Sequence, residues 1–180
     1  MLIDASRSTL LLVDLQAKVL PAVDGADVVV ANAVWLLRAA QKIGVPVAAV
    51  EHHAKGLGPL IPEVRDLLPA GAVASKQHFS AVAQQCLPGL PGGDRVQYVI
   101  AGVETHVCVL QTALDLVADG KDVFVVGDAV GSRRPYDRDV ALARMRDEGV
   151  RVVTREMVVF EWLEDSTSQL FRDVHQEFLR

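Results

Sequence analysis

Short runs of apolar residues recur along this chain and alternate with amphipathic segments. The runs do not alternate polar and apolar side chains, which indicates strands that are buried on both faces, as in a parallel sheet. Glycines such as Gly44, Gly120 and Gly149 follow the amphipathic segments, and glycine is a common stop for a helix. The runs cover residues 9–13, 47–50, 72–74, 96–101, 122–126 and 150–153, and helices are expected over 26–43, 105–118 and 136–147.

This alternation predicts an α/β protein in which helices cover both faces of a mostly parallel sheet. We expect three layers, α/β/α, around a six-stranded, Rossmann-like sheet. A chain of 180 residues suits one domain with a full-sized core, so residues 1–180 are expected to form a single domain. The tail is predicted to form a polar-faced helix from about Ser166, with that residue as the N-cap.

Charge and composition narrow the classes of partner. The chain has 18 Lys and Arg against 23 Asp and Glu, a formal net charge of −5, so it lacks the basic surface typical of nucleic-acid binders. No apolar run approaches the roughly 20 residues that a membrane span needs. The segment Met1-Leu2-Ile3-Asp4 lacks the pattern of a signal peptide, and a cytoplasmic protein is expected. Two cysteines, Cys86 and Cys108, cannot form a disulfide scaffold or a four-ligand zinc site.

Chemically active side chains follow several of the predicted strands. Asp14 follows the first run, Lys76 the third, and Glu104 and Cys108 the fourth. In open parallel sheets, ligands bind beyond the carboxyl ends of the strands. We therefore expect an acid, a base and a thiol to meet at one edge of the sheet. The other polar residues at this edge are Glu51, His52, His53, Thr105, His106 and Asp128.

Cys108 lies in the first turn of a predicted helix. At about 100° per residue it falls beside Thr112 and Asp115, on the polar side and away from the apolar stripe that contains Leu110 and Leu114. A helix N-terminus lowers the pKa of a thiol, and its free N–H groups can bind an oxyanion. Cys108 is thus placed as an activated nucleophile would be. The alternative is a small buried residue without a chemical role, which is common for free cysteine.

Several segments are similar in sequence to a known family. The chain resembles the isochorismatase-like cysteine hydrolases over roughly residues 8–160, and among them the small, single-domain isochorismatase-domain proteins. The family's fold is a six-stranded parallel sheet between helices, which matches the six apolar runs. The matching strings are TLLLVDLQ from Thr9, EHHAKGLG from Glu51, SKQHFSA from Ser75, AGVETHVCVLQT from Ala101 and DAVGSR from Asp128.

The resemblance implies a catalytic triad of Asp14, Lys76 and Cys108. Cys108 would attack a carbonyl carbon to form a covalent acyl-enzyme, and Asp14 would take the thiol proton and pass it to the leaving amine. Lys76 would lower the pKa of both partners. A cis peptide between Val103 and Glu104 would turn the Glu104 N–H toward the site, where it forms an oxyanion hole with the Cys108 N–H. Taken alone, Asp14 is better interpreted as a strand-end residue that binds backbone N–H groups, and Lys76 as an ordinary solvated lysine; the combination with the cysteine string favours the triad.

Gln16, Phe79 and Thr105 are the substrate-binding candidates by position. Phe79 is expected in the pocket or in the core, and Thr105 has a second interpretation as a helix cap. Relatives called nicotinamidases hold a metal through an Asp-x-His element after the second strand. This chain has Glu51-His52-His53 there, and adjacent side chains on an extended segment point apart, so no metal and no cofactor are expected.

Three functions remain open on the sequence. The first is a cysteine-dependent hydrolase of a small amide or a related carbonyl compound. The second is an enol-ether hydrolase of the isochorismatase type, which needs no thiol, and the third is a catalytically silent binding protein. Nucleotide binding lacks its Gly-x-Gly-x-x-Gly signature after the first strand. The relatives also imply a homo-oligomer, for which the C-terminal residues Phe160, Trp162, Leu163, Leu170, Phe171 and Phe178 supply apolar surface, unless they pack on their own domain.

Overall fold

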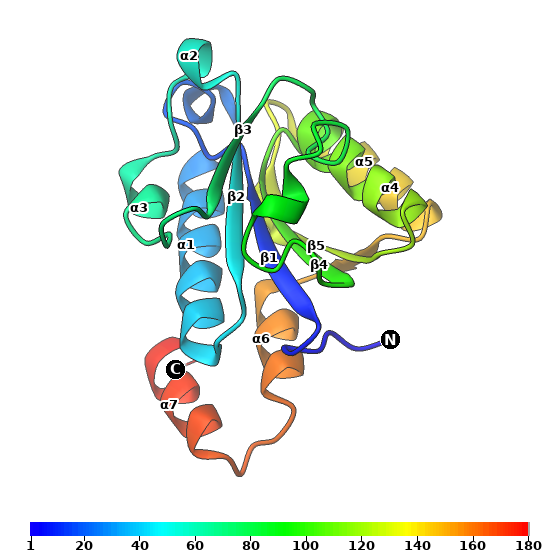
Figure 1. Ribbon diagram of the computed structural model, residues 1–180. Helices are drawn as coiled ribbons and strands as arrows, with labels where there is room; N and C mark the ends of the chain where they lie inside the picture. Colours follow the sequence, from blue (N-terminus) through cyan, green and yellow to red (C-terminus); the bar gives the residue numbers. More distant parts are fainter. Residues whose placement is uncertain (180) are drawn as a thin grey trace.

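A single sheet of six parallel strands organises the protein, and the computed structural model describes residues 1–179. The strand order is β3-β2-β1-β4-β5-β6, and every neighbouring pair is parallel (Figure 1). The predicted parallel sheet with six strands is therefore confirmed. The strands are β1 (Ser8–Val13), β2 (Val47–His52), β3 (Val73–Lys76), β4 (Gln97–Val103), β5 (Asp122–Gly131) and β6 (Arg151–Val153).

Helices cover both faces of the sheet, as the three-layer prediction requires. Figure 1 shows α1, α6 and α7 on one side of the sheet and α4 and α5 on the other. These helices are α1 (Ala26–Ile43), α4 (Leu110–Ala118), α5 (Pro135–Asp147), α6 (Arg155–Leu163) and α7 (Gln169–Phe178). The shorter turns are η1 (Leu20–Ala22), α2 (Ala54–Leu57), α3 (Pro62–Arg65), η2 (Leu87–Gly89) and η3 (Thr105–Val109). No helix within residues 1–179 is both long and apolar enough to cross a membrane.

The central strand β1 is buried on both faces, which explains its uninterrupted apolar run. Leu10 and Leu12 pack into the core beneath α1 and α6, whereas Leu11 and Val13 pack into the core beneath α4 and α5. Burying a leucine side chain stabilises a fold by roughly 1.5–3 kcal/mol. The two cores therefore hold β1 and its neighbour β4 rigidly, and these two strands end at the candidate site.

Several local boundaries differ from the sequence prediction, and one helix was not predicted. β3 extends to Lys76, and β5 extends to Gly131 because its second half continues to pair with β4. The tail helix begins at Gln169 with Ser168 as its cap, not Ser166, because the Ser168 hydroxyl accepts the Phe171 N–H at 3.0 Å. The helix α6 was not predicted, although Thr154 caps it in the usual way.

The chain changes direction in the sheet between β1 and β4. From β1 it proceeds through β2 and β3 on one side, then returns to form β4 on the other side. The carboxyl ends of two such strands diverge and leave a crevice where ligands bind. Asp14 and Glu104 follow these two strands, and both adopt left-handed backbone conformations, with φ of 55° and 58°. Non-glycine residues in this conformation are concentrated at functional sites.

Candidate active site

Asp14 and Lys76 form a buried ion pair at the carboxyl edge of the sheet. Asp14 follows β1, and Lys76 ends β3 and extends past β2 to donate from Nζ to Asp14 Oδ2 at 3.1 Å. The side chains are only 3% and 0% exposed. Burial of either charge alone would be costly, so each side chain stabilises the charge of the other. The second carboxylate oxygen, Asp14 Oδ1, is buried and has no conventional hydrogen-bond partner within the described chain.

Cys108 enters the same site from a widened helical turn. The Glu104 carbonyl accepts the N–H of Val107 at 2.9 Å and the N–H of Val109 at 3.3 Å, and the Cys108 N–H between them does not join this pair. Cys108 is buried, 3% exposed, and Thr112, expected beside it on the polar side, is fully buried too, so that side of the helix does not face solvent. Such π-type turns are frequent at functional sites.

The surroundings keep the Cys108 thiol protonated. The pKa of Cys108 is raised to about 12, mainly by burial and next by the negative charge of Asp14, while Lys76 opposes both. The sequence-based expectation of a lowered thiol pKa is wrong, because desolvation and the carboxylate outweigh the lysine and the helix N-terminus. The resting site therefore holds a neutral thiol next to a carboxylate.

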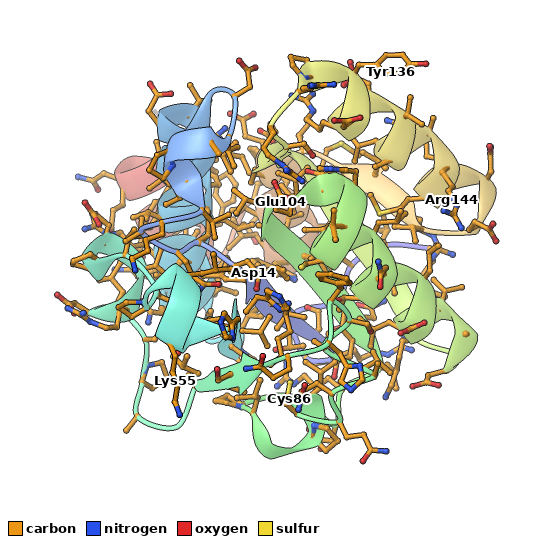
Figure 2. The ribbon with its side chains drawn as sticks, turned by 90° about the horizontal axis from the view of Figure 1, so that it is seen from above. Asp14, Lys55, Cys86, Glu104, Tyr136 and Arg144 are labelled. Atoms are coloured by element: carbon orange, nitrogen blue, oxygen red, sulfur yellow. The ribbon has the colours of Figure 1, made fainter. Side chains whose placement is uncertain are left out.

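A cavity of about 330 Å³ opens in front of these groups. Its walls are mainly apolar, and the charged groups lie at its floor and its rim. Seen from above the sheet, Asp14 and Glu104 lie near the centre of the molecule, whereas Tyr136 and Arg144 lie at the periphery (Figure 2). The lining residues are Asp14, Lys18, Val19, Ala22, His52, Leu57, Phe79, Glu104, Val107, Cys108 and Arg133.

Two contacts join the η3 turn to the end of β5. Arg133 Nη2 donates to Glu104 Oε2 at 3.1 Å, and His106 Nδ1 lies 3.0 Å from Ser132 Oγ. Sequence reasoning singled out Glu104 and His106 but did not place Arg133 at the cavity. The string DAVGSR, which ends at Arg133, was the available signal, because it follows a strand of the same sheet.

The substrate-binding candidates occupy different places. Phe79 lines the cavity, 49% exposed, with its ring centroid 5.3 Å from that of His52. Gln16 is fully buried instead, and its amide binds the backbone N–H and carbonyl of His52 and the carbonyl of Gly58. Thr105 is also fully buried; Glu104 is the residue at the cap position. Neither Gln16 nor Thr105 lines the cavity, so Gln16 supports the loop behind it.

The peptide between Val103 and Glu104 is not cis, so this part of the sequence-based expectation is corrected. The chain reverses at Glu104 through its left-handed conformation, which redirects the backbone without a cis bond. Such a conformation costs a non-glycine residue roughly 1–2 kcal/mol, less than a non-proline cis bond.

The remaining polar residues at this edge have mostly structural contacts. Asp128 accepts the Arg155 N–H at 2.9 Å, and His53 Nδ1 lies 3.2 Å from Gln77 Oε1. Burial lowers the pKa of His52, and Lys76 lowers it further, so its ring is neutral at pH 7. Within residues 1–179, no three His, Cys, Asp or Glu side chains group as metal ligands would.

Comparison with known proteins places this site in a family. The family model "Isochorismatase domain" matches residues 8–157. The chain belongs to the isochorismatase family. Isochorismatase domain-containing protein 2 of Xenopus laevis is 37% identical over 170 residues, which cover 94% of this chain and 82% of that protein.

Solved structures share the fold of this isochorismatase-family chain. A structure of MAR1 ribonuclease from Caenorhabditis elegans has a TM-score of 0.89 and 29% identity, and covers 100% of this chain and 93% of that one. The YcaC gene product of Escherichia coli, described as an octameric hydrolase of unknown specificity, has a TM-score of 0.91 and 27% identity. That match covers 99% of this chain and 91% of the YcaC chain.

Proposed function

We propose that this isochorismatase-family protein is a cysteine-dependent hydrolase of a small amide and works through a covalent acyl-enzyme. One observation carries the proposal: a buried thiol and a carboxylate line one small cavity, and a buried ammonium group pairs with that carboxylate. The description of the YcaC product as a hydrolase supports the reaction class. The proposed catalytic residues are Asp14, Lys76 and Cys108.

In the first half-reaction, the Cys108 sulfur attacks the amide carbon while its proton moves to Asp14. The C–S bond forms, and the carbonyl electron pair moves to oxygen. We assign the Cys108 N–H group as a donor to this oxyanion. The carbonyl then re-forms, the C–N bond breaks, and Asp14 returns the proton to the leaving nitrogen.

In the second half-reaction, water replaces the amine. Asp14 takes a proton from the water as its oxygen attacks the thioester carbon. Collapse of this second intermediate breaks the C–S bond, and the sulfur regains the proton from Asp14. Lys76 keeps Asp14 in place and offsets its charge whenever Asp14 is deprotonated, because an unpaired buried charge is costly.

Replacement of Cys108 tests this mechanism. We expect Cys108→Ala to lower amide turnover on the order of 10³-fold or more, and the wild-type protein to show the mass of an acyl adduct on the Cys108 peptide. Cys86→Ser is the matched control, because Cys86 is half-buried, does not line the cavity, and donates to the Ala81 carbonyl at 3.5 Å.

The two alternatives give different results in the same assay. Cleavage of isochorismate that survives Cys108→Ala would favour the enol-ether hydrolase, since vinyl protonation needs no thiol. Binding of small amides without turnover by the wild-type protein would favour a silent binding protein.

We also propose that the protein forms a homo-oligomer. The octameric description of the YcaC product supports this proposal, since the two chains match over nearly their full lengths.

A further inference from the structure

Two cations, Lys18 and Arg133, line the cavity together with two carboxylates, Asp14 and Glu104, although the chain as a whole has a formal net charge of −5. Lys76 is fully buried and does not line the cavity, but it pairs with the lining carboxylate Asp14. The two ion pairs Lys76–Asp14 and Arg133–Glu104 account for both carboxylates, each at 3.1 Å. Lys18 is left without an acidic partner within residues 1–179.

The two outer cations, Lys18 and Arg133, are here called the mouth cations. Lys18 is exposed, and its Nζ donates to the Gly56 carbonyl at 3.1 Å, which holds the ammonium against the loop after β2. Arg133 is 57% exposed and uses Nη2 for Glu104. Both side chains retain N–H donors that are free to bind an anion.

The space between the floor and the mouth cations is apolar. Val19, Ala22, Leu57, Phe79 and Val107 line it. A ligand that reaches from Cys108 to the mouth cations therefore has a reactive carbonyl at one end, a short hydrocarbon part, and an anionic group at the other end. A volume of about 330 Å³ restricts it to a small molecule.

We propose that the substrate is a small amide that carries a carboxylate at its far end, and that Lys18 and Arg133 bind this carboxylate. The proposal rests on the proposed amide hydrolysis and adds the substrate class. Arg133 forms the stronger contact, because a guanidinium can bind a carboxylate through two parallel N–H groups. Arg133 also pairs with Glu104, the residue that precedes the η3 turn with Cys108. Through Arg133, the carboxylate end of the substrate is therefore linked to the turn that contains the nucleophile.

The test compares two amides that differ in this one group: the monoamide of glutaric acid, and pentanamide, in which a methyl replaces the carboxylate. We expect the wild-type kcat/KM to favour the anionic amide by about tenfold or more. The preference, taken as the ratio of the two kcat/KM values, should fall by about tenfold in Arg133→Met and by about two- to fivefold in the more exposed Lys18→Met. Added salt should raise KM for the anionic amide more than for pentanamide.

Neighbouring residues provide matched controls. Arg134→Met removes the same charge one residue away, and Lys55→Met removes a lysine charge near Lys18; both residues are exposed, and neither lines the cavity. If these variants lower the preference as much as Arg133→Met and Lys18→Met do, general charge attraction explains it and the proposed site is overturned.

The outcomes separate this inference from the proposed function. If the kcat/KM for pentanamide equals that for the anionic amide, the mouth cations do not select the substrate. The proposed amide hydrolysis is then still supported. If the wild-type protein hydrolyses neither amide, calorimetry measures the affinity of the Cys108→Ala protein for each amide and so tests the carboxylate site without catalysis. Tighter binding of the anionic amide, weakened by Arg133→Met, supports the site without catalysis; equal binding or no binding overturns it.

Discussion

At the scale of single residues, the chemistry depends on where the Cys108 proton resides. The pKa of this thiol is raised to about 12, first by burial and then by Asp14. A free thiol in an unfolded chain ionises near 8.5. Between these two values the folded protein keeps a proton that the unfolded chain loses. The protonated thiol therefore stabilises the fold below about pH 8.5, and this contribution is lost as the pH rises toward 12.

This difference predicts a pH-dependent effect of one substitution. We expect the free energy of unfolding of the wild-type protein to fall more steeply from pH 8.5 to 10.5 than that of Cys108→Ser, whose hydroxyl does not titrate there. Urea denaturation of both proteins at several pH values measures the difference. Tyr98, whose pKa is also raised to about 12, affects both proteins equally. Parallel curves would show that Cys108 titrates normally.

The buried pair Asp14–Lys76 makes a second prediction. Asp14→Asn removes the proposed proton acceptor and leaves Lys76 as an unpaired buried cation. We expect loss of turnover and a cost of about 3–5 kcal/mol in stability. The double variant Asp14→Asn with Lys76→Met should regain part of that stability but no activity, as measured by urea denaturation and amide assay. If the stability losses caused by the two single substitutions simply add in the double variant, the charge interaction between Asp14 and Lys76 does not stabilise the fold.

At the scale of elements, the close approach of β1 and β4 sets the position of the site. Gly102 has a φ of 138°, and a Cβ on it would lie 2.1 Å from the Val13 carbonyl oxygen. Any side chain there would force the two strands apart, directly before Asp14 and Glu104. The glycine is thus required by the sheet and, through it, by the geometry of the cavity.

Gly102→Ala should therefore affect both stability and activity. We expect a loss of roughly 3 kcal/mol, the upper end for an overfilled core, together with reduced turnover. Gly120→Ala is the control, because its Cβ would meet no atom within 4 Å, although its φ of 77° carries its own strain. Thermal denaturation and the amide assay compare the two variants. Equal losses of turnover would show that the strand contact does not position the site.

Helices and strands were predictable from the sequence where the local pattern of apolar residues matches the burial of the element in the folded protein. The apolar run of β1 is readable because both faces of that strand are buried. The left-handed Glu104 and the widened turn around Cys108 were not, because this turn is joined to residues far away in sequence, through Arg133–Glu104 and His106–Ser132. Gln16 shows the same limit: its position suggested a substrate contact, but the loop at His52 takes its amide.

At the scale of the whole molecule, the C-terminal apolar residues divide into two groups. Trp162 and Leu163 are buried against their own domain, and Phe171 and Phe178 pack partly on the same core. Self-packing therefore explains most of this segment. Phe160 on α6 and Leu170 on α7 are different, because they remain 46% and 37% exposed.

One turn before Phe160 on α6, Met157 is also 46% exposed, so this helix presents an apolar pair to its surroundings. We expect these two side chains to lie in the interface of the proposed homo-oligomer. Light scattering after size-exclusion chromatography should give a multiple of the 19.4 kDa chain mass, and the double variant Met157→Glu with Phe160→Glu should shift it toward the monomer. Tyr136→Ser, on α5 and 77% exposed, is a control for loss of exposed apolar surface elsewhere. A wild-type mass of one chain at all concentrations would contradict the proposed oligomer. If the double variant keeps the wild-type mass, Met157 and Phe160 of α6 do not lie in the interface.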